Sequence, residues 1–518
     1  MMMTMPFPKE KMLLLVSYTI VILLCITVMV LSSGSTNLII KNYGTLQHYE
    51  FPPSNYTYRV FQNATFTYRI NAFGYVDDHN NDPAVVINNA LWNCSVAGGG
   101  SIYVFPDTYQ TNTPIGGNPL YSNSFSNVYL QLGNGTIIKR ISMGGDPLGD
   151  NMFWLVNPLV NPGDGTINFT LTSNGTAYFD AQGYACGAKI YTVYNSTFSN
   201  ITFQHLYGEG LKVSRARYCV FENISVYSYD QSYADQGMFT GGCIEYCNFT
   251  NIDLDGNNQA LSRGGFYLDC TDAVTRGSTV FDGSYFNRVT KLWIHNVRRT
   301  GVYLSGADTS GVYPTRATHN NTFTNCTMEN NWQSAYNAIK LRPAINNTFT
   351  DIIIRNWTDP ITTGTAYDTD AVIANCTGNY VQATIYGSTV TSLILTSDGN
   401  NQDVSDNFFN LTVENGTGTY FASATNSTIK NNVVYMNFTN CVNAIYLDSG
   451  VFTNNTFYLN FTNCGGGGHS DIYHNAAGWT NMVNNTFNVY ATSGNPNGLM
   501  DFVNGTQSNI VVYPYTAP

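Results

Sequence analysis

The chain has 518 residues, of which only 11% are charged, and its formal net charge at pH 7 is −11. An average soluble domain is about 25% charged, so most of the polar surface here is supplied by Asn, Thr, Ser and Tyr. The negative charge and the lack of a basic run argue against nucleic acid and anionic membrane surfaces as partners.

The first segment of the chain is an apolar run that is not part of a soluble fold. Lys9 and Lys11 precede the run Met12–Leu31, and small residues follow it. A run of about 20 apolar residues spans a bilayer and exceeds the usual 7–15-residue core of a cleaved signal peptide. We expect residues 1–35 to be either a single-pass signal anchor or a cleaved signal peptide, followed by a stalk over residues 36–70. Both alternatives place the rest of the chain outside the cell, tethered to the membrane or secreted.

Residues 71–110 have the pattern of a helix followed by a strand. Asp82 is suited to the N-cap of a helix over Pro83–Val96, because proline is tolerated at the first helical position and apolar residues follow at helical spacing. Gly98-Gly99-Gly100 ends the helix, and Ser101–Phe105 has the composition of a strand.

The remainder of the chain contains a short repeat. The phrase Asn431–Cys441 returns as Asn454–Cys464, an offset of about 23 residues, in the range typical of solenoids. Short apolar runs separated by Asn, Gly, Thr and Asp indicate strands and turns. Three such strands per coil predict an all-β fold, a single right-handed parallel β-helix over residues 111–518, with 71–110 as its N-terminal cap. We expect each coil to stack its inward aromatic residue on the next and each repeated Asn to bond its copies above and below. The clearest inward aromatic residues are Phe198, Phe221, Phe249, Phe323 and Phe349.

The segment Asn71–Gln110 as a whole resembles the N-terminal signature of the pectate-lyase superfamily, in its rhamnogalacturonase/epimerase-like branch. It shares the Phe-Gly start, the Ala/Ile-rich helix and the three glycines, and its strand is followed by Pro106-Asp107-Thr108-Tyr109, where the family has Pro-x-Gly-x-Tyr. It departs from that signature at Asp77–Asn80, where a Gly-Asp-Gly turn is missing, and at Asp107, where Gly is usual. The resemblance implies a β-helix whose first coil is covered by the helix. The signature occurs in polysaccharide lyases, glycoside hydrolases, epimerases and virus tail spikes, so it leaves the chemistry open.

Catalytic motifs of the polygalacturonase-like members are mostly missing. Asn251-Ile252-Asp253 has the spacing of their first motif, but no Asp-Asp or Gly-His-Gly follows, and Lys340-Leu341-Arg342 reverses the order of the last one. A standard polygalacturonase is therefore not expected.

Charged residues nevertheless concentrate between about Tyr207 and Arg316, where the repeat is interrupted by long excursions that would form the walls of a groove. Asp253 and Asp255 follow Asp230 by about one coil, which predicts a ladder of carboxylates on one face with Asp269 as the next rung. The candidate catalytic residues are Asp230, Asp253, Asp255, Asp269 and Arg263. The candidate substrate-binding residues are Tyr233, Asp235, Arg298 and Arg299.

Two chemistries remain open for this cluster. Two carboxylates across a sugar ring can act as acid and as base or nucleophile. Alternatively, Arg or Lys removes the proton alpha to a uronate while Asp residues hold calcium against the carboxylate. We expect no required cofactor, calcium only in a lyase, and no transition-metal site. The plainer alternative is that these charges are solvated or paired along a polar face.

Two classes of function follow. The first is a cell-surface or secreted enzyme, a lyase or glycoside hydrolase that acts on an extracellular, uronate-containing polysaccharide. The second is a non-catalytic glycan-binding adhesin, cell-envelope component or virus-like receptor-binding spike. Both imply a glycan as partner and a membrane contact through the N-terminal segment, and both leave oligomerisation open.

Two kinds of covalent modification agree with an extracellular setting. Cys441 and Cys464 occupy the same place in adjacent coils, whose spacing of about 4.8 Å suits a disulfide. Asn-x-Ser/Thr triplets are frequent, although the coil consensus Asn-Asn-Thr-Phe produces them without any selection for sugar, so we expect only a fraction to carry glycans. The candidate acceptors are Asn55, Asn134, Asn168, Asn223, Asn356, Asn410 and Asn504.

Overall fold

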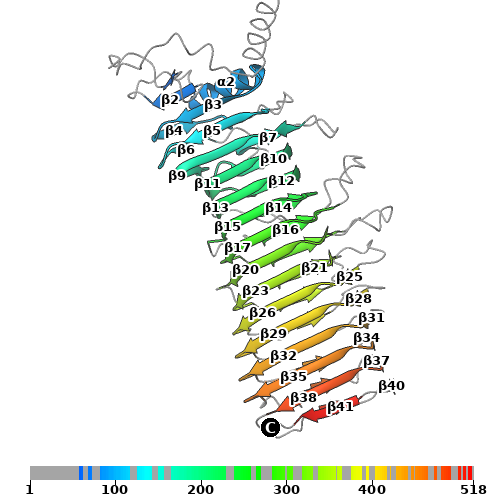
Figure 1. Cartoon of the computed structure of the whole chain (residues 1–518). Coiled ribbons are helices and arrows are strands. Elements are labelled where there is room, and N and C mark those ends of the chain that lie inside the picture. The colour runs from blue at the N-terminus through cyan, green and yellow to red at the C-terminus, as the bar shows by residue number, and fades with distance from the viewer. Residues whose placement is uncertain are drawn as a thin grey trace, which may run out of the picture.

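The computed structural model is an elongated stack of β-coils, and the helix α2 lies at its N-terminal end (Figure 1). The residues it describes are 58–61, 68–72, 82–116, 125–142, 150–156, 165–228, 238–257, 264–269, 283–297, 300–306, 318–330, 337–342, 344–357, 359–363, 375–387, 393–395, 403–416, 420–421, 428–441, 445–447, 450–464, 472–474, 480–491, 500–502, 506–508 and 511–515.

The strands of these residues form four sheets. The largest, here called the long-strand sheet, comprises β1 Tyr58–Phe61, β2 Tyr68–Ala72, β3 Gly100–Val104, β4 Thr108–Thr111, β5 Val128–Leu132, β6 Ile137–Arg140, β9 Thr170–Asp180, β11 Thr197–Leu206, β13 Val220–Ser228, β15 Asn248–Asp255, β17 Arg288–His295, β20 Thr322–Glu329, β23 Thr348–Arg355, β26 Tyr380–Tyr386, β29 Phe408–Glu414, β32 Val433–Thr439, β35 Thr456–Thr462, β38 Thr486–Ala491 and β41 Val511–Tyr515. The ten-stranded sheet comprises β7 Asn151–Val156, β8 Thr166–Ile167, β10 Cys186–Tyr194, β12 Leu211–Arg217, β14 Phe239–Gly242, β16 Gly264–Asp269, β18 Thr300–Ser305, β21 Asn337–Arg342, β24 Asp359–Thr363 and β27 Leu393–Leu395.

Two smaller sheets complete the coils. The eight-stranded sheet comprises β19 Thr318–His319, β22 Ala344–Ile345, β25 Asn375–Thr377, β28 Asp403–Ser405, β31 Thr428–Lys430, β34 Gly450–Thr453, β37 Thr480–Val483 and β40 Thr506–Ser508. The four-stranded sheet comprises β30 Tyr420–Phe421, β33 Ile445–Leu447, β36 Ile472–His474 and β39 Met500–Phe502.

Successive coils pair in parallel, as a β-helix requires. Strand β11 pairs with β13, β13 with β15 and β15 with β17, and among the described strands only β1 and β2 pair antiparallel. Because parallel crossover connections in proteins are right-handed, this path is that of a right-handed parallel β-helix. The predicted fold class is therefore confirmed at the level of an all-β parallel β-helix.

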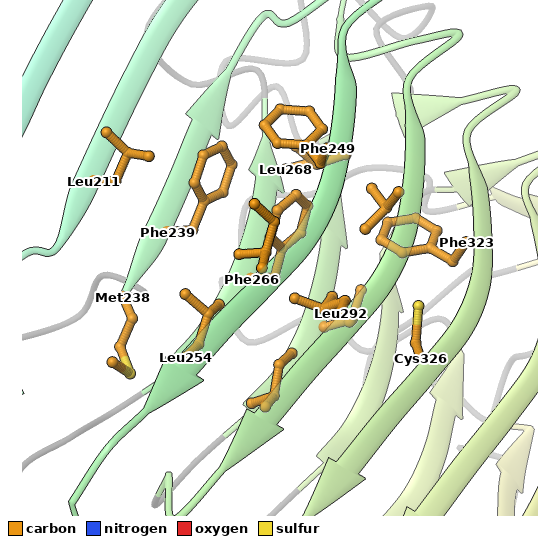
Figure 2. Close-up of a cluster of buried hydrophobic side chains, with 14 of the residues drawn as sticks. Leu211, Met238, Phe239, Phe249, Leu254, Phe266, Leu268, Leu292, Phe323 and Cys326 are labelled. Atoms are coloured by element: carbon orange, nitrogen blue, oxygen red, sulfur yellow. The ribbon is translucent and has the colours of Figure 1, made fainter. Parts of the chain in front are cut away.

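The inward column of aromatic residues is confirmed. Phe198, Phe221 and Phe249 are aligned in register, with ring centroids 5.1 and 4.8 Å apart. Phe323 and Phe349 continue the column beyond a valine, with centroids 4.7 Å apart. Figure 2 shows how rings from the ten-stranded sheet, such as Phe239 and Phe266, lie opposite Phe249 and fill the interior. Apolar faces from two sheets thus make one continuous core.

A second inward column consists of asparagines at the turn into the long-strand sheet. Asn407 is representative: its Oδ1 accepts hydrogen bonds from the backbone N and the Nδ2 of Asn379, at 2.8 and 3.0 Å. Its Nδ2 donates to Asn432 Oδ1 at 3.0 Å and to the carbonyl of Cys376 at 2.9 Å. The ladder runs through Asn287, Asn321, Asn347, Asn379, Asn407, Asn432, Asn455 and Asn485, all buried. The asparagine excess therefore has the structural cause expected from the repeat.

The ladder also explains many of the glycosylation triplets. Asn454-Asn455-Thr456 and its relatives place an exposed turn asparagine before a buried ladder asparagine, so the triplet arises from the coil itself. Of the named acceptors, Asn134, Asn168, Asn223 and Asn356 are exposed and Asn410 is half-buried. Asn55 and Asn504 lie outside the described residues. Glycosylation of any of them stays a prediction.

The helix α2 spans Pro83–Val96 and packs against β1 to β5. Asp82 is its N-cap, accepting a hydrogen bond from Ala84 N at 2.9 Å, and it also accepts from Asn112 N at 2.7 Å. One carboxylate thus ties the start of the helix to the end of β4. Its place at the end of the stack is the one expected of a cap (Figure 1).

The predicted disulfide is wrong. Cys441 and Cys464 are both buried free thiols. Cys441 Sγ donates toward the carbonyl of Thr439 at 3.5 Å, and Cys464 Sγ toward that of Thr462 at 3.4 Å. A hydrogen bond between the two thiols and their burial raise the pKa of Cys441 well above that of an ordinary thiol. Stacking brought the residues together as expected, but coil spacing is only a necessary condition for a disulfide, and here the sulfurs are satisfied by backbone carbonyls.

The apolar segment Met12–Leu31 lies outside the described residues. Among the residues that are described, no helix has the length and apolar character needed to cross a bilayer. The anchor, the stalk and the domain boundaries at 35, 70 and 110 remain predictions.

Replacing Phe457 by Ala tests the inward column. This side chain is 1% exposed and stacks on Phe487 at 4.7 Å, so its truncation should lower the free energy of unfolding by about 3–5 kcal/mol through lost burial and a cavity. Replacing half-buried Asn410 by Gln should change it far less. Urea unfolding of both variants makes the comparison, and equal losses would contradict the inward and outward assignment.

Candidate functional site

Most of the predicted site residues fall outside the described part of the chain. They are Asp230, Tyr233, Asp235, Arg263, Arg298 and Arg299. Asp253 and Asp255 lie on β15 of the long-strand sheet. Asp269 ends β16 of the ten-stranded sheet, and its side chain is outside the description.

The strand register contradicts one rung of the expected carboxylate ladder. Asp255 is aligned with Tyr227 in the preceding coil and with His295 in the following one. Asp269 is aligned with Gly242 in a different sheet. The prediction placed Asp269 one coil after Asp255 by counting residues, but the chain turns a corner between β15 and β16 within a single coil. The next rung after the aspartates is histidine.

His295 and the two aspartates form a half-buried network on the outer face of the long-strand sheet. His295 Nε2 lies 2.9 Å from Asp253 Oδ1, and its Nδ1 lies 3.5 Å from Asp255 Oδ1. Tyr227 donates its hydroxyl to Asp253 Oδ2 at 3.2 Å. Asn296 Nδ2 donates to Asp255 Oδ1 at 2.9 Å. The cluster is a chain of coupled titratable groups: Tyr227, Asp253, His295 and Asp255.

Electrostatics favour the protonated form of the histidine. Burial by itself lowers the pKa of His295, but the hydrogen bond to Asp253 and the charges of Asp255 and Asp253 outweigh burial and raise it above its usual value. Burial and the charge of Asp253 raise the pKa of Tyr227. Both ring nitrogens of His295 are engaged, Nε2 with Asp253 and Nδ1 with Asp255 and with Asn296 Nδ2 at 3.0 Å.

Trp293 gives this network an exposed aromatic wall. It is aligned with Asp253 in the neighbouring strand, is 45% exposed, and its ring centroid lies 4.1 Å from that of His295. Stacking on the imidazole provides dispersion, and a cation–π contact is added when the imidazole is protonated. The indole can therefore offer a flat apolar face beside charged groups.

The aspartates fit calcium poorly. Asp253 faces the imidazolium and the Tyr227 hydroxyl, and Asp255 accepts from Asn257 N at 2.7 Å as well as from Asn296. Calcium requires several free oxygen ligands. No group of three or more His, Cys, Asp or Glu residues in the described ranges is placed to hold a metal. Calcium in a lyase reaction stays a prediction.

A second polar row lies on the outer face of the ten-stranded sheet. Cross-strand register aligns Trp154 with Lys189, Lys189 with Lys212 and Lys212 with Thr240. The same row continues through Tyr267, Tyr303 and Lys340. We call these residues the lysine–aromatic row. The side chains on either side of each, such as Phe266 and Leu268 around Tyr267, point into the core, which fixes the row on the outer face.

Aromatic rings support the lysines of this row. Lys189 Nζ lies 5.6 Å from the centroid of Trp154 and 5.3 Å from that of Tyr191. Lys340 Nζ lies 5.4 Å from the centroid of Tyr303. Lys212 Nζ lies 3.5 Å from Glu209. The ammonium groups of Lys189 and Lys340 thus lie over the faces of aromatic rings, where cation–π attraction positions them.

Trp154, the first residue of the row, has an indole N–H group that donates no hydrogen bond in the described structure. Its Nε1 is buried. A buried N–H without an acceptor costs about 1–3 kcal/mol, and such groups often mark a place where a ligand binds.

Sequence reasoning missed the lysine–aromatic row, although a signal existed. Lys189-Ile190-Tyr191, Tyr267-Leu268-Asp269 and Lys340-Leu341-Arg342 all alternate polar, apolar and polar residues. Comparison with catalytic motifs identified Lys340-Leu341-Arg342 only as a reversed motif. Side chains alternate between the two faces of a strand, so aligning the central apolar residues of the three triplets predicts that their first residues lie in one row on the outer face.

Comparisons with known proteins find solved structures with a similar chain path. No family model and no curated protein matches this sequence. The family 28 exopolygalacturonase of Yersinia enterocolitica is similar over 80% of this chain and 76% of its own, at 10% identity and a TM-score of 0.49. The tailspike protein of E. coli bacteriophage HK620, as a double mutant, is similar over 80% and 68%, at 14% identity and 0.39. The surface adhesin PfbA of Streptococcus pneumoniae is similar over 80% and 88%, at 13% identity and 0.33.

At TM-scores below 0.5 these likenesses carry no argument about what this chain does. The fold rests on the strand register of the chain itself, and its parallel sheets fit the pectate-lyase superfamily that the Asn71–Gln110 segment resembles.

The His295 network makes stability depend on pH. Because the folded-state pKa of His295 is raised above the unfolded value of about 6.5, its contribution is fully present below that pH and is lost as pH rises through the folded pKa. Urea midpoints of the wild type and of His295→Gln should therefore differ more at pH 6 than at pH 9. A titration by NMR should give a pKa for His295 that falls in Asp253→Asn, and an unchanged pKa would refute the network.

Proposed function

We propose that this protein is an extracellular glycan-binding β-helix that holds an acidic polysaccharide along the outer face of its ten-stranded sheet. The observation that carries the proposal is the lysine–aromatic row, in which Lys189, Lys212 and Lys340 share one register line with Trp154 and two tyrosines. Ammonium groups complement uronate carboxylates, and flat rings suit the apolar faces of sugars.

The shape of the row agrees with a linear ligand. Parallel strands in register are about 4.8 Å apart, so the row runs along the axis of the stack. Lys189, Lys212, Tyr303 and Lys340 are partly exposed, whereas Thr240 and Tyr267 in the middle of the row are buried. A polysaccharide chain laid along that axis would meet lysines and rings in turn. The N-terminal apolar run supports display outside the cell, as a membrane-anchored or a secreted protein.

Substitution of the three lysines tests this proposal. Lys189→Gln, Lys212→Gln and Lys340→Gln together should weaken binding to polygalacturonate or alginate by about tenfold or more at low salt, because each ion pair contributes up to about 1 kcal/mol. Wild-type binding should fall as salt rises. Calorimetry or an affinity gel with the full-length protein measures both effects.

The matched control is Lys291→Gln, which removes an exposed lysine from the outer face of the long-strand sheet. It should leave binding unchanged. The proposal is wrong if the wild type binds no uronan, or if the triple variant and the control behave alike.

The Asp253–His295–Asp255 network favours a second candidate function, cleavage or modification of the bound glycan. Its titratable groups retain some exposure, His295 stacks on Trp293, and they could exchange a proton with a sugar held there. The contacts do not distinguish a lyase from a glycoside hydrolase, and calcium would serve only the former.

If the protein is an enzyme of this kind, Asp253→Asn should lower turnover by at least about 10²-fold while the fold stays intact. The assay follows reducing ends and the absorbance of unsaturated products from uronans and neutral glycans. Should Asp253→Asn and Asp255→Asn both keep full activity on a substrate that the wild type degrades, catalysis lies elsewhere. Should nothing be degraded, binding without catalysis remains.

A further inference from the structure

One turn of the coil adopts the left-handed backbone conformation in every described coil from residue 127 to residue 484. At this turn the backbone N–H of each residue donates to the same carbonyl position of the next coil, as from Asn195 to Arg217 and from Asn320 to Ile345. The residues of this column are Asn127, Asn168, Asn195, Tyr218, Tyr246, Phe286, Asn320, Asn346, Gly378, Asp406, Asn431, Asn454 and Asn484, with φ between 47° and 68°.

Three consecutive members of the column are aromatic, whereas all the others are asparagine, aspartate or glycine. Glycine, asparagine and aspartate tolerate positive φ, whereas a bulky side chain there is a backbone outlier that costs free energy. Tyr218, Tyr246 and Phe286 have φ of 57°, 53° and 54°. The turn therefore does not select these aromatic residues, and neither does the core, because they are 55%, 40% and 47% exposed.

The three rings form an exposed strip, here called the turn strip. Tyr218 and Tyr246 have ring centroids 5.1 Å apart and nearly parallel planes at 21°, and Tyr246 and Phe286 repeat this at 5.1 Å and 17°. Tyr285 packs edge-on against Tyr246 at 5.7 Å and against Phe286 at 5.6 Å.

Buried groups lie beneath the strip. Glu245 is fully buried and pairs with Arg217. Burial and the Glu245 carboxylate raise the pKa of Tyr285 far above its usual value, so its hydroxyl stays protonated. The rings therefore rest on a buried ion pair and a neutral phenol.

We propose that the turn strip is a second binding site, for the uncharged pyranose rings of a neutral glycan. The three stacked rings present a continuous row of apolar edges without charge, and the turn asparagines Asn195 and Asn320 continue it at both ends with amides that suit sugar hydroxyls. It differs in chemistry from the lysine–aromatic row, which suits acidic chains.

The size of the turn strip argues against a second copy of the chain as its occupant. An aromatic side chain contributes about 150–250 Å² when fully buried. Three that are half-exposed offer roughly 300 Å², against about 800 Å² per partner in a stable protein interface. A narrow strip flanked by polar side chains instead matches a linear chain of rings.

The test replaces all three rings with the residue that the turn prefers. Tyr218→Asn, Tyr246→Asn and Phe286→Asn in the full-length protein relieve the backbone, so the unfolding midpoint should stay unchanged or rise. Calorimetry with cellohexaose, xylohexaose, mannohexaose and chitohexaose should show that the wild type binds at least one of them. The triple variant should lose about tenfold or more in affinity.

Matched variants separate this site from the acidic-glycan site. The Lys189, Lys212 and Lys340 triple variant should keep neutral-glycan binding, which should be insensitive to salt. The control Tyr435→Thr breaks another exposed stacked pair, Tyr435 and Tyr458 at 4.3 Å, which lies on strands without backbone strain, and should change nothing.

Several outcomes would overturn the proposal. They are failure of the wild type to bind any of the four probes, binding that survives loss of the rings, and an equal loss in Tyr435→Thr. A lower unfolding midpoint with binding intact would assign the rings to coil stacking. A change of mass in sedimentation velocity without a change in glycan binding would assign them to self-association.

Discussion

The asparagine ladder is the interaction on which the rest of the structure depends. Each buried carboxamide both donates and accepts between adjacent coils and also satisfies a backbone carbonyl, as Asn407 does between Asn379, Asn432 and Cys376. Leaving even one of these buried groups unsatisfied would cost about 1–3 kcal/mol. From Asn287 to Asn485 the ladder therefore fixes the register of each coil on the next, and the outward rows of side chains in those coils inherit that register.

The ladder changes its chemistry in the coils that carry the turn strip. There the inward position is Cys219 and then Cys247, and Cys219 N donates to Cys247 Sγ at 3.4 Å before the amide ladder begins at Asn287. A thiol is a weaker hydrogen-bond partner than a carboxamide. Tyr218 and Tyr246 of the turn strip thus precede a thiol, whereas Phe286 precedes the first carboxamide of the ladder.

The sequence was sufficient for the fold because the fold is repetitive. Phe198, Phe221 and Phe249 recur at coil spacing, so their stacking could be predicted from the sequence. Asp82 and Pro83 likewise predict the start of the helix. The side chains that share an outer face were harder to predict. Asp269 and Asp255 are close in sequence but belong to different sheets, while His295 is distant in sequence and bonded to both Asp253 and Asp255. The sheet to which a residue belongs depends on the number of residues in each coil. That number varies where long segments interrupt the repeat, so counting residues does not assign them to a sheet.

The two outer faces divide the polar chemistry of the chain. On the long-strand sheet, carboxylates are already matched by His295, Tyr227 and Asn296. On the ten-stranded sheet, the ammonium groups of Lys189 and Lys340 lie over aromatic rings. A protein with few charges can keep such faces distinct because little else on its surface competes electrostatically.

The near-identity of neighbouring coils has a consequence for the length of the molecule. Asn432 and Asn455 make the same contacts 23 residues apart, and Phe457 follows Val434 in the same inward column. A segment that begins and ends at equivalent turn positions can be removed or duplicated, and every column then rejoins in place. The length of the β-helix can therefore change by one coil at a time while the contacts between neighbouring coils stay the same.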